Sequence, residues 1–209
     1  MILSANGLGF SYPARHVFNG WSHDFGAGLS WVRGPNGSGK STLLQLLAGA
    51  LPLRAGSLRV NGIDATQQPL AYRREVFWCG AGPIAFDHLR PPEFFGFMRS
   101  LYPRFDAAAL PAHIAGFGLA PQLDLRLARL SAGTQRKVWL AAALVANSAA
   151  VLIDEPVNAL DAASLAHLQR ALLHCAADPA RAWIVTSHEP LGPAGELAQR
   201  LDLPAASAA

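Results

Sequence analysis

The chain has 209 residues, of which 51% are hydrophobic and 15% charged, and its formal net charge is +3. This length predicts a single domain, 1–209, with a sizeable core. The basic residues form no run that would suit nucleic acid, the two cysteines give no metal or disulfide spacing, and no apolar run is long enough to span a membrane. The high apolar content reflects either the many alanines or a surface that docks on a partner. We expect a cytoplasmic protein that does not bind nucleic acid.

Short apolar segments separated by Gly and Asn turns over residues 1–33 predict antiparallel strands. Within them, LSWVR (29–33) predicts a buried strand that leads into a glycine-rich loop, followed by a helix at 40–50. GSLRVNG (56–62) predicts another strand, ending in an Asn-Gly turn. The N-terminal part of the chain therefore predicts a small antiparallel β region beside the first unit of a strand–helix fold.

From 84 to 147 the pattern becomes helical and is interrupted by Pro and Gly. The remainder alternates between strand and helix, with a strand at 150–154, a helix at 162–176 and a strand at 182–187. Such alternation predicts an α/β fold with a mostly parallel sheet. We therefore expect a core of residues 1–83 and 148–203, an inserted helical subdomain at 84–147, and a frayed tail at 204–209.

Residues 34–41 match the phosphate-binding pattern G-x-x-x-x-G-K-[ST] at every fixed position. Glycines let the backbone wrap a polyphosphate, and the helix that follows adds its positive end. Lys40 would reach the β- and γ-phosphates, and the Ser41 hydroxyl would ligate Mg²⁺. An ordinary glycine-rich turn explains the glycines but not the Lys-Ser pair. The predicted nucleotide contacts here are Gly34, Pro35, Asn36, Gly37, Ser38, Gly39, Lys40, Ser41 and Thr42.

Polar side chains also follow the two later strands. Asp154 ends the strand at 150–154 and Glu155 comes next. At the carboxyl edge of a parallel sheet, Asp154 would hold Mg²⁺ through a water and Glu155 would act as general base. His188 follows the strand at 182–187 and would contact the γ-phosphate and keep the attacking water in register with Glu155. The alternatives are a solvated strand end for the two acids and a surface position for the histidine.

Leu-Ser-Ala-Gly-Thr, residues 130–134, predicts a second helix start, with Ser131 as N-cap. A helix N-terminus of this kind is another anion site. Kinases and small GTPases that contain a phosphate loop lack such an element. The stretch therefore separates this chain from those classes.

With these motifs in this order, the chain resembles the ATP-binding subunits of the ATP-binding cassette (ABC) transporter family over nearly its whole length. Tyr12 lies where that family places an aromatic ring that stacks on adenine; the alternative is a core or hairpin tyrosine. The other matching stretches are Walker A (34–41), the signature (130–134), Walker B (151–155), the D-loop (158–161) and the switch residue His188. The resemblance implies a P-loop NTPase core with an N-terminal antiparallel β subdomain and an inserted helical subdomain.

The resemblance also implies how the parts work together. Two copies would face each other head to tail, with ATP and Mg²⁺ between the Walker A stretch of one and the signature of the other. The signature residues Ser131, Ala132, Gly133 and Thr134 would then act in trans, and Asp161 would help to link the two sites. The helical block 84–147 would meet an integral membrane subunit, which places the protein at the inner face of the cell membrane.

Two positions depart from the family pattern. Gly82 stands where the family usually has a glutamine that touches Mg²⁺ and senses the membrane subunit, and Thr134 replaces the customary signature glutamine. Lys40, Glu155 and His188, the expected catalytic residues, are present. The sequence therefore predicts an active but slow ATPase.

We expect this ATPase to power export through a separate membrane subunit, because the chain is short and lacks the C-terminal extension common in importer subunits. The stretches FWCGAGP (77–83) and TSHEPL (186–191) are similar to those of the heme-exporter ATPases of cytochrome c maturation. A subunit that binds ATP without hydrolysing it, and an ATP-dependent switch outside transport, remain as alternatives. The sequence leaves open whether the partner ATPase is identical.

Overall fold

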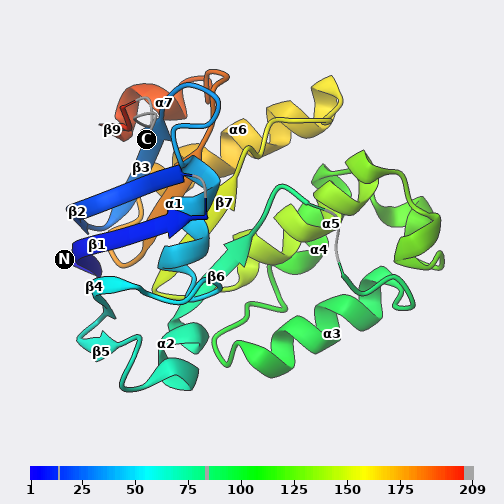
Figure 1. The fold of residues 1–209 in the computed structure, drawn as a ribbon. Helices are drawn as coiled ribbons and strands as arrows, with labels where there is room; N and C mark the ends of the chain where they lie inside the picture. The colour runs from blue at the N-terminus through cyan, green and yellow to red at the C-terminus, as the bar shows by residue number, and fades with distance from the viewer. Residues whose placement is uncertain (14, 83–84, 205–209) are drawn as a thin grey trace.

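A computed structural model describes residues 1–13, 15–82 and 85–204 (Figure 1). It contains two β-sheets and several helices, which confirms the α/β class and the mostly parallel sheet. The strands are β1 (Leu3–Tyr12), β2 (Arg15–Phe25), β3 (Gly28–Arg33), β4 (Ala55–Val60), β5 (Ile63–Asp64), β6 (Val76–Cys79), β7 (Ala150–Asp154), β8 (Ala182–Thr186) and β9 (Gln199–Asp202). The helices are α1 (Lys40–Leu47), α2 (Pro69–Glu75), α3 (Pro91–Leu101), α4 (Leu110–Gly116), α5 (Ala132–Val145), α6 (Ala162–Ala176) and α7 (Ala194–Leu197), with 3-10 turns η1 (Ala120–Gln122) and η2 (Leu127–Arg129).

The antiparallel sheet has the order β2-β1-β4-β5. The Asn-Gly turn predicted after β4 is present, with Asn61 and Gly62 at positive φ values of 48° and 81°. β3 differs from the expectation of antiparallel strands over 1–33, because it lies in the other sheet and runs parallel to β8 and β9. Its residues 28–32 are all buried, as expected of an interior strand covered on both faces.

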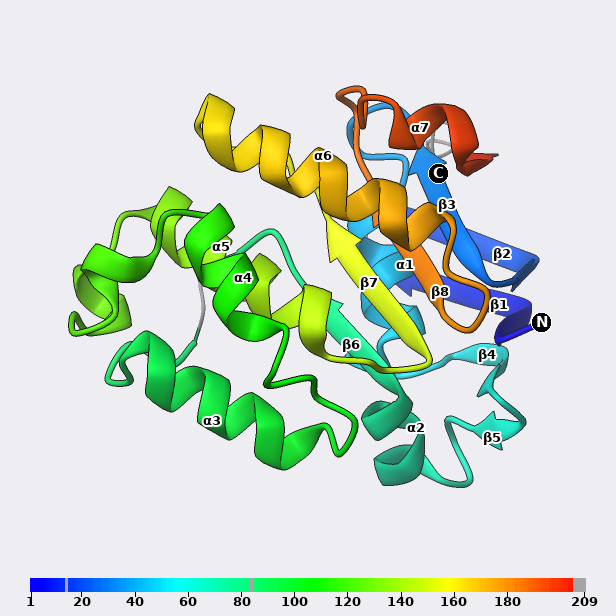
Figure 2. The ribbon, with the colours of Figure 1, turned by 180° about the vertical axis from the view of Figure 1, so that it is seen from behind.

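The parallel sheet, with the order β6-β7-β8-β3-β9, is the central layer of the molecule. Alternate residues along β7 face opposite sides. Val151 and Ile153 join the hydrophobic cluster that contains side chains of α5 and α6, whereas Leu152 joins the cluster that contains α1 and the antiparallel sheet. α5 and α6 therefore cover one face of the sheet, and α1 lies on the other (Figure 2).

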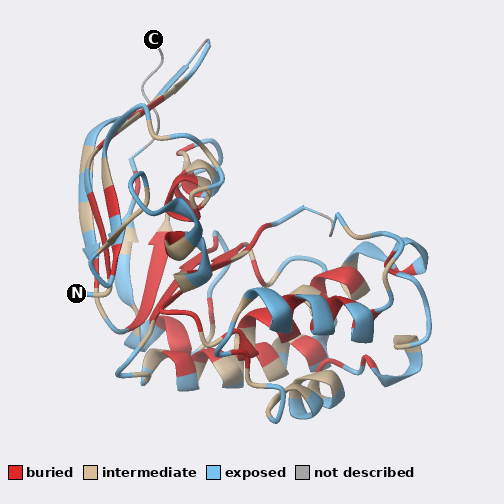
Figure 3. Cartoon of the chain, turned by 90° about the horizontal axis from the view of Figure 1, so that it is seen from below, coloured by how far each residue is buried: buried red, intermediate tan, exposed pale blue. Residues whose placement is uncertain are grey.

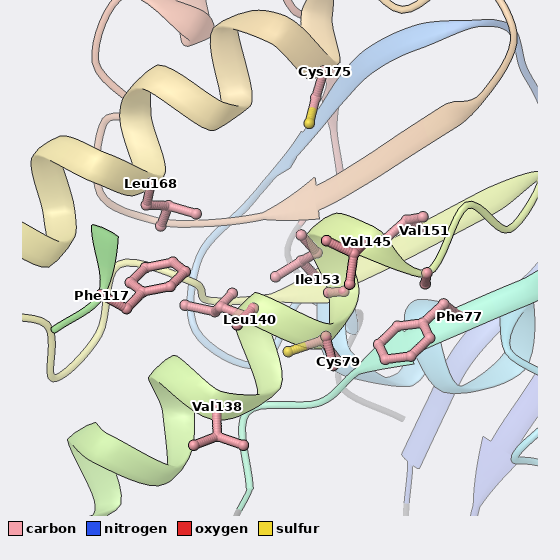
Figure 4. Packing of buried hydrophobic residues seen from close by; sticks show 14 of the residues in the cluster. Phe77, Cys79, Phe117, Val138, Leu140, Val145, Val151, Ile153, Leu168 and Cys175 are labelled. Atoms are coloured by element: carbon pink, nitrogen blue, oxygen red, sulfur yellow. The ribbon is translucent and has the colours of Figure 1, made fainter. Parts of the chain in front are cut away.

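The helical part of the chain lies between β6 and β7 in sequence and to one side of the two sheets, with its buried faces turned toward one another (Figure 3). α5 connects it to the sheet, since Leu140 and Val145 belong to the same cluster as Phe77 and Ile153 (Figure 4). The subdomain boundaries proposed from sequence, 84–147, stay a prediction, because this shared cluster extends across them.

Several short elements have no counterpart among the elements predicted from sequence, including α2, β5, β6, α7 and β9. Of these, β9 completes the edge of the parallel sheet beside β3. Within the part of the chain that the structure describes, no helix is long and apolar enough to cross a membrane. The predicted frayed tail, 204–209, lies outside the described residues from 205 onward.

Two histidines connect the helical part to α6. His113 Nδ1 on α4 and His167 Nε2 on α6 are 3.1 Å apart, and their rings meet edge to face. Burial lowers the pKa of both imidazoles; His167 lowers that of His113 further, and Arg170 lowers that of His167. Asp106 acts in the opposite direction on His113. The folded state therefore favours neutral imidazoles at this contact.

We predict that this contact weakens on acidification. In the unfolded chain both histidines titrate near their ordinary pKa of 6.5. As pH falls below that value, the unfolded state takes up protons that the folded state resists, so the free energy of unfolding decreases. Chemical denaturation at a series of pH values from 7.5 to 5 measures the free energy of unfolding. This free energy will decrease less steeply with falling pH in a His113→Asn, His167→Gln variant than in the unmodified chain. Since His23 is common to both proteins, its titration cancels in the comparison; equal slopes would contradict the prediction.

Candidate nucleotide-binding site

The loop between β3 and α1, residues 34–39, has a backbone that requires glycine. A Cβ on Gly34 would lie 2.5 Å from Ser38 Oγ and 2.8 Å from the carbonyl oxygen of Leu203. Gly39, at φ 97°, is the N-cap of α1, and a Cβ there would lie 2.7 Å from Val17 Cγ1. Among the described residues, no side chain caps α1, so the N–H groups of its first turn are available to an anion.

Lys40 is buried beneath this loop, with 7% of its side chain exposed. Its Nζ donates hydrogen bonds to the carbonyl oxygens of Gly34 at 2.8 Å and Pro35 at 3.3 Å. The same Nζ lies 3.9 Å from Glu155 Oε1. Carbonyl oxygens and a nearby carboxylate lower the cost of burying the ammonium group, and they fix its position at the bottom of the loop.

The phosphate-loop pocket, a cavity of about 340 Å³, opens above Lys40. It brings together Tyr12, much of the 34–42 stretch, Glu155 and His188, which the sequence predicts as parts of one site. The lining residues are Tyr12, Arg15, Val17, Asn36, Gly37, Gly39, Lys40, Ser41, Thr42, Glu155, Asn158 and His188. Tyr12 is 43% exposed, and its hydroxyl lies 3.4 Å from Thr42 Oγ1.

The two carboxylates lie where β7 ends beside β8. The parallel register pairs Asp154 with Thr186, and Thr186 Oγ1 donates a 2.6 Å hydrogen bond to Asp154 Oδ1. The N–H of Glu155 donates to the carbonyl oxygen of Thr186 at 3.0 Å. Glu155 has a positive φ of 48° and its side chain lines the pocket, whereas the side chain of Asp154 is buried next to Thr186.

His188 and Glu155 form a direct pair. His188 Nδ1 is 2.9 Å from Glu155 Oε2, and the backbone N–H of His188 donates to the same oxygen at 3.3 Å. Glu155 has only 13% of its side chain exposed, so its carboxylate lies between Lys40 and His188 with limited access to water. The imidazole itself remains 47% exposed at the mouth of the site.

Residues 131–134 form the start of α5 and do not line the phosphate-loop pocket. Ser131 is the N-cap, as predicted: its Oγ accepts the N–H of Thr134 at 3.2 Å and lies 2.9 Å from Thr134 Oγ1. Gly133 packs against the loop after Glu155, where a Cβ would lie 2.6 Å from the carbonyl oxygen of Ala159. Within one chain, the two predicted anion sites are therefore separate.

Asp161 caps α6 and is also bound to α5. Its Oδ1 accepts the N–H of Ser164 at 2.9 Å, and Lys137 forms an ion pair with its Oδ2. The hydrogen bond from Lys137, and then that from Ser164, hold the pKa of the Asp161 carboxyl well below its usual range. Its predicted role between two subunits stays a prediction.

Comparison with known proteins identifies the family. The ABC transporter family model matches residues 26–158. This chain belongs to the ABC transporter family. It is 34% identical over 204 residues, 97% of each chain, to the cytochrome c biogenesis ATP-binding export protein CcmA 2 of Salmonella paratyphi A. It is 38% identical over 167 residues, 78% of each chain, to CcmA of Pseudomonas savastanoi pv. phaseolicola.

The fold is similar to solved members of the same family. A structure of the ATP-binding subunit of an ABC transporter matches with a TM-score of 0.81 and 24% identity over 90% of this chain and 80% of the other. A bacterial Atm1-family ABC exporter with ATP bound matches with a TM-score of 0.73 and 22% identity over 90% of this chain and 34% of the exporter. At these identities, the likeness shows the ABC ATPase fold alone.

Several residues at the site were not predicted from the sequence. Arg15 and Val17 line the pocket from β2. Asn158 falls in the predicted D-loop, 158–161, without a role of its own, and it lines the pocket from the loop after Glu155. Arg136 on α5 is 7% exposed, and its guanidinium donates to the carbonyl oxygens of Gly80 and Asp154. Arg136 stands between Gln135 and Lys137 in the polar first turns of α5, so nothing in the local sequence marks it as buried or reveals its partners.

Gly82, the departure from the family pattern, borders a second cavity of about 270 Å³ beside Glu155, Arg136 and Trp139. A Cβ on Gly82 would meet no atom within 4 Å. Of the described residues that line this cavity, Glu155 and Asn158 also line the phosphate-loop pocket. Among the described residues, the space next to the Glu155 carboxylate is therefore open at Gly82, the position at which the family pattern has a glutamine.

We predict that the hydroxyl of Thr186 is needed to hold Asp154. Thr186→Val keeps the shape but removes the donor to a buried carboxylate, so the free energy of unfolding should fall by about 2–3 kcal/mol. Thr186→Ser keeps the hydroxyl and loses one methyl group, which costs about 1 kcal/mol. Urea denaturation of the two variants measures the difference. If the Thr186→Val variant proved as stable as the Thr186→Ser variant, the hydrogen bond to Asp154 would not stabilise the fold as we describe.

Proposed function

We propose that this chain hydrolyses ATP as one subunit of a dimer that powers export. The observation that supports this most directly is the position of the Glu155 carboxylate in the phosphate-loop pocket, 3.9 Å from Lys40 Nζ and 2.9 Å from His188 Nδ1. A base, a phosphate-binding cation and a second polar contact are thus gathered in one cavity. Its volume of about 340 Å³ lies in the usual range for small-molecule sites.

The pocket offers a different group to each part of ATP. The backbone N–H groups of residues 34–42 and the start of α1 would hold the phosphates, and Lys40 would neutralise their charge. The ring of Tyr12, which lines the same pocket and is 43% exposed, would stack on adenine. Catalysis by positioning and charge stabilisation, with little covalent chemistry, is what phosphoryl transfer requires.

Glu155 would accept a proton from the water that attacks the γ-phosphate. His188 would hold that carboxylate in place through Nδ1 and its backbone N–H, while its exposed ring faces the substrate. General-base catalysis of this type contributes about 10²–10⁴-fold in rate. The reaction then releases ADP and phosphate, which are separate molecules and no longer hold the two sides of the site together.

Two side chains, at the start of α1 and the end of β7, bear the oxygen ligands that Mg²⁺ prefers. Ser41 lines the pocket with its hydroxyl in the first turn of α1. Asp154 lies outside the pocket lining, is 3% exposed, and accepts a hydrogen bond from Thr186 at its Oδ1. These two residues would hold the ion, directly or through water. Bound there, Mg²⁺ would neutralise charge on the β- and γ-phosphates.

Residues 131–134 would act on the ATP bound by a second copy of the chain. They lie at a helix start outside the pocket of their own chain. In a head-to-tail dimer, Ser131, Ala132, Gly133 and Thr134 would approach the γ-phosphate held by the partner. Neither chain would then have a complete site alone, and dimer closure would control hydrolysis.

The membrane partner and cargo are inferred from the relatives. Proteins 34–38% identical to this chain are named cytochrome c biogenesis ATP-binding export proteins. We therefore place this ATPase at the cytoplasmic face of the cell membrane, bound to an integral membrane subunit through the helical part of the chain. Within that system, heme export for cytochrome c maturation is the more specific candidate function.

Replacing Glu155 tests hydrolysis directly. Glu155→Gln keeps the size of the side chain but removes the base, so turnover of Mg-ATP by the dimer, measured with its membrane subunit, should fall by about 10²–10⁴-fold. Size-exclusion chromatography with ATP should show a dimer that persists in this variant and dissociates in the unmodified protein. If both proteins behave alike, the chain binds ATP without hydrolysing it.

Mixing two defective variants tests the shared site. Lys40→Ala damages the phosphate loop and Ser131→Arg blocks the signature, so each variant alone should be inactive. Random pairing makes half of the dimers mixed, and each mixed dimer has one intact site of two, which should restore roughly a quarter of the wild-type rate if the sites act independently. If both groups acted within one chain, the mixture would stay inactive.

A further inference from the structure

Arg15 is the charged residue of the phosphate-loop pocket to which no motif assigns a role. It is the first residue of β2 and pairs with Tyr12 across the hairpin between β1 and β2. Its guanidinium donates to the carbonyl oxygen of Gly37 in the phosphate loop. A Cβ on Gly37 would lie 3.3 Å from both terminal nitrogens of Arg15, so the guanidinium lies directly against the loop.

The charge of Arg15 is less compensated than that of Lys40, the other cation in the lining of the pocket. Lys40 and His188 both face Glu155, at 3.9 and 2.9 Å. Among the described residues, no carboxylate oxygen lies within 4.0 Å of the Arg15 guanidinium, and its described hydrogen bond goes to a neutral carbonyl. A phosphate oxygen is a stronger acceptor than a neutral carbonyl, because it carries negative charge and because a phosphate can accept two parallel N–H bonds from one guanidinium.

The geometry points to a phosphate ligand and not to a base contact. The residue that Arg15 touches, Gly37, belongs to the loop that would wrap the phosphates. Arginine also presents several N–H donors in one plane, which matches the oxygens of a phosphate.

We propose that Arg15 is a second cation for the polyphosphate of the nucleotide, exchanging the carbonyl of Gly37 for phosphate oxygens when the ligand binds. This inference rests on the proposed nucleotide site. It makes the hairpin between β1 and β2 a sensor of the phosphates as well as a platform for the base. The site would thereby favour nucleoside di- and triphosphates over nucleosides and monophosphates.

The test compares a ligand that contains a base with one that lacks it. Binding of ADP to the full chain is measured by calorimetry, and inorganic tripolyphosphate is measured by its displacement of a fluorescent ADP analogue. Arg15→Gln should weaken both ligands about tenfold, a loss of about 1.4 kcal/mol. The affinities of Arg15→Lys for both ligands should lie between those of the unmodified chain and those of Arg15→Gln, since lysine keeps the charge but not the planar donors.

Two control variants distinguish a phosphate contact of Arg15 from a general effect of charge and from a contact with the base. Arg54→Gln removes the same charge from a neighbouring pocket that Tyr12 also lines, and should change neither affinity. Tyr12→Ala should weaken ADP but not tripolyphosphate. The inference is overturned if Arg15→Gln leaves both affinities unchanged, or weakens ADP alone, which would assign Arg15 to the base or ribose. Thermal unfolding of each variant verifies the fold.

The outcomes also distinguish this inference from the proposed function. If the unmodified chain binds and hydrolyses ATP while Arg15→Gln binds both ligands normally, only the role of Arg15 fails. If the unmodified chain binds neither ADP nor tripolyphosphate, the nucleotide site itself is wrong. A reduced dependence of ADP affinity on salt in Arg15→Gln would support the phosphate contact, because fewer charges then meet the ligand.

Discussion

The site depends on the parallel pairing of β7, β8 and β3. Because these strands run in the same direction within one sheet, the residues that follow them all emerge at one edge. Glu155, His188 and the loop 34–39 thereby meet, although they are far apart in sequence. The register pairs Asp154 with Thr186, and the hydrogen bond between their side chains fixes the position of the C-terminal end of β7 relative to β8. A slip of one residue would turn every side chain of a strand to the opposite face.

Charges buried around this edge tie the elements together. Lys40 is held by carbonyl oxygens of its own loop and by Glu155, and Arg136 is held by the carbonyl oxygens at the ends of β6 and β7. Leaving a buried charge without its partner costs about 3–5 kcal/mol. The phosphate loop, the two strand ends and α5 therefore hold their arrangement only as a unit, and the contacts that stabilise the fold are those that position the site.

The local parts of the site could be predicted from sequence because each depends on neighbouring residues. The phosphate loop, the N-cap at Ser131 and the strand before Asp154 are patterns of a few residues, and the structure has a loop, a cap and a strand at those positions. Arg15 could not be predicted, since its contact with Gly37 joins segments that meet only through the hairpin of β1 and β2. β9, four residues beside β3, has no distinctive pattern of its own and forms because an edge of the sheet is free.

The sequence by itself determined the fold class, the phosphate loop and the positions along the chain of the polar residues that follow the strands. These features depend on the spacing of hydrophobic residues and on short motifs, both of which involve only neighbouring residues. Only the tertiary structure decided that β3 belongs to the parallel sheet, that Glu155 lies between Lys40 and His188, and that residues 131–134 lie outside the pocket of their own chain. These outcomes depend on which buried faces pack together across the whole chain. Distance in space between residues far apart in sequence is set by that packing and not by any local pattern.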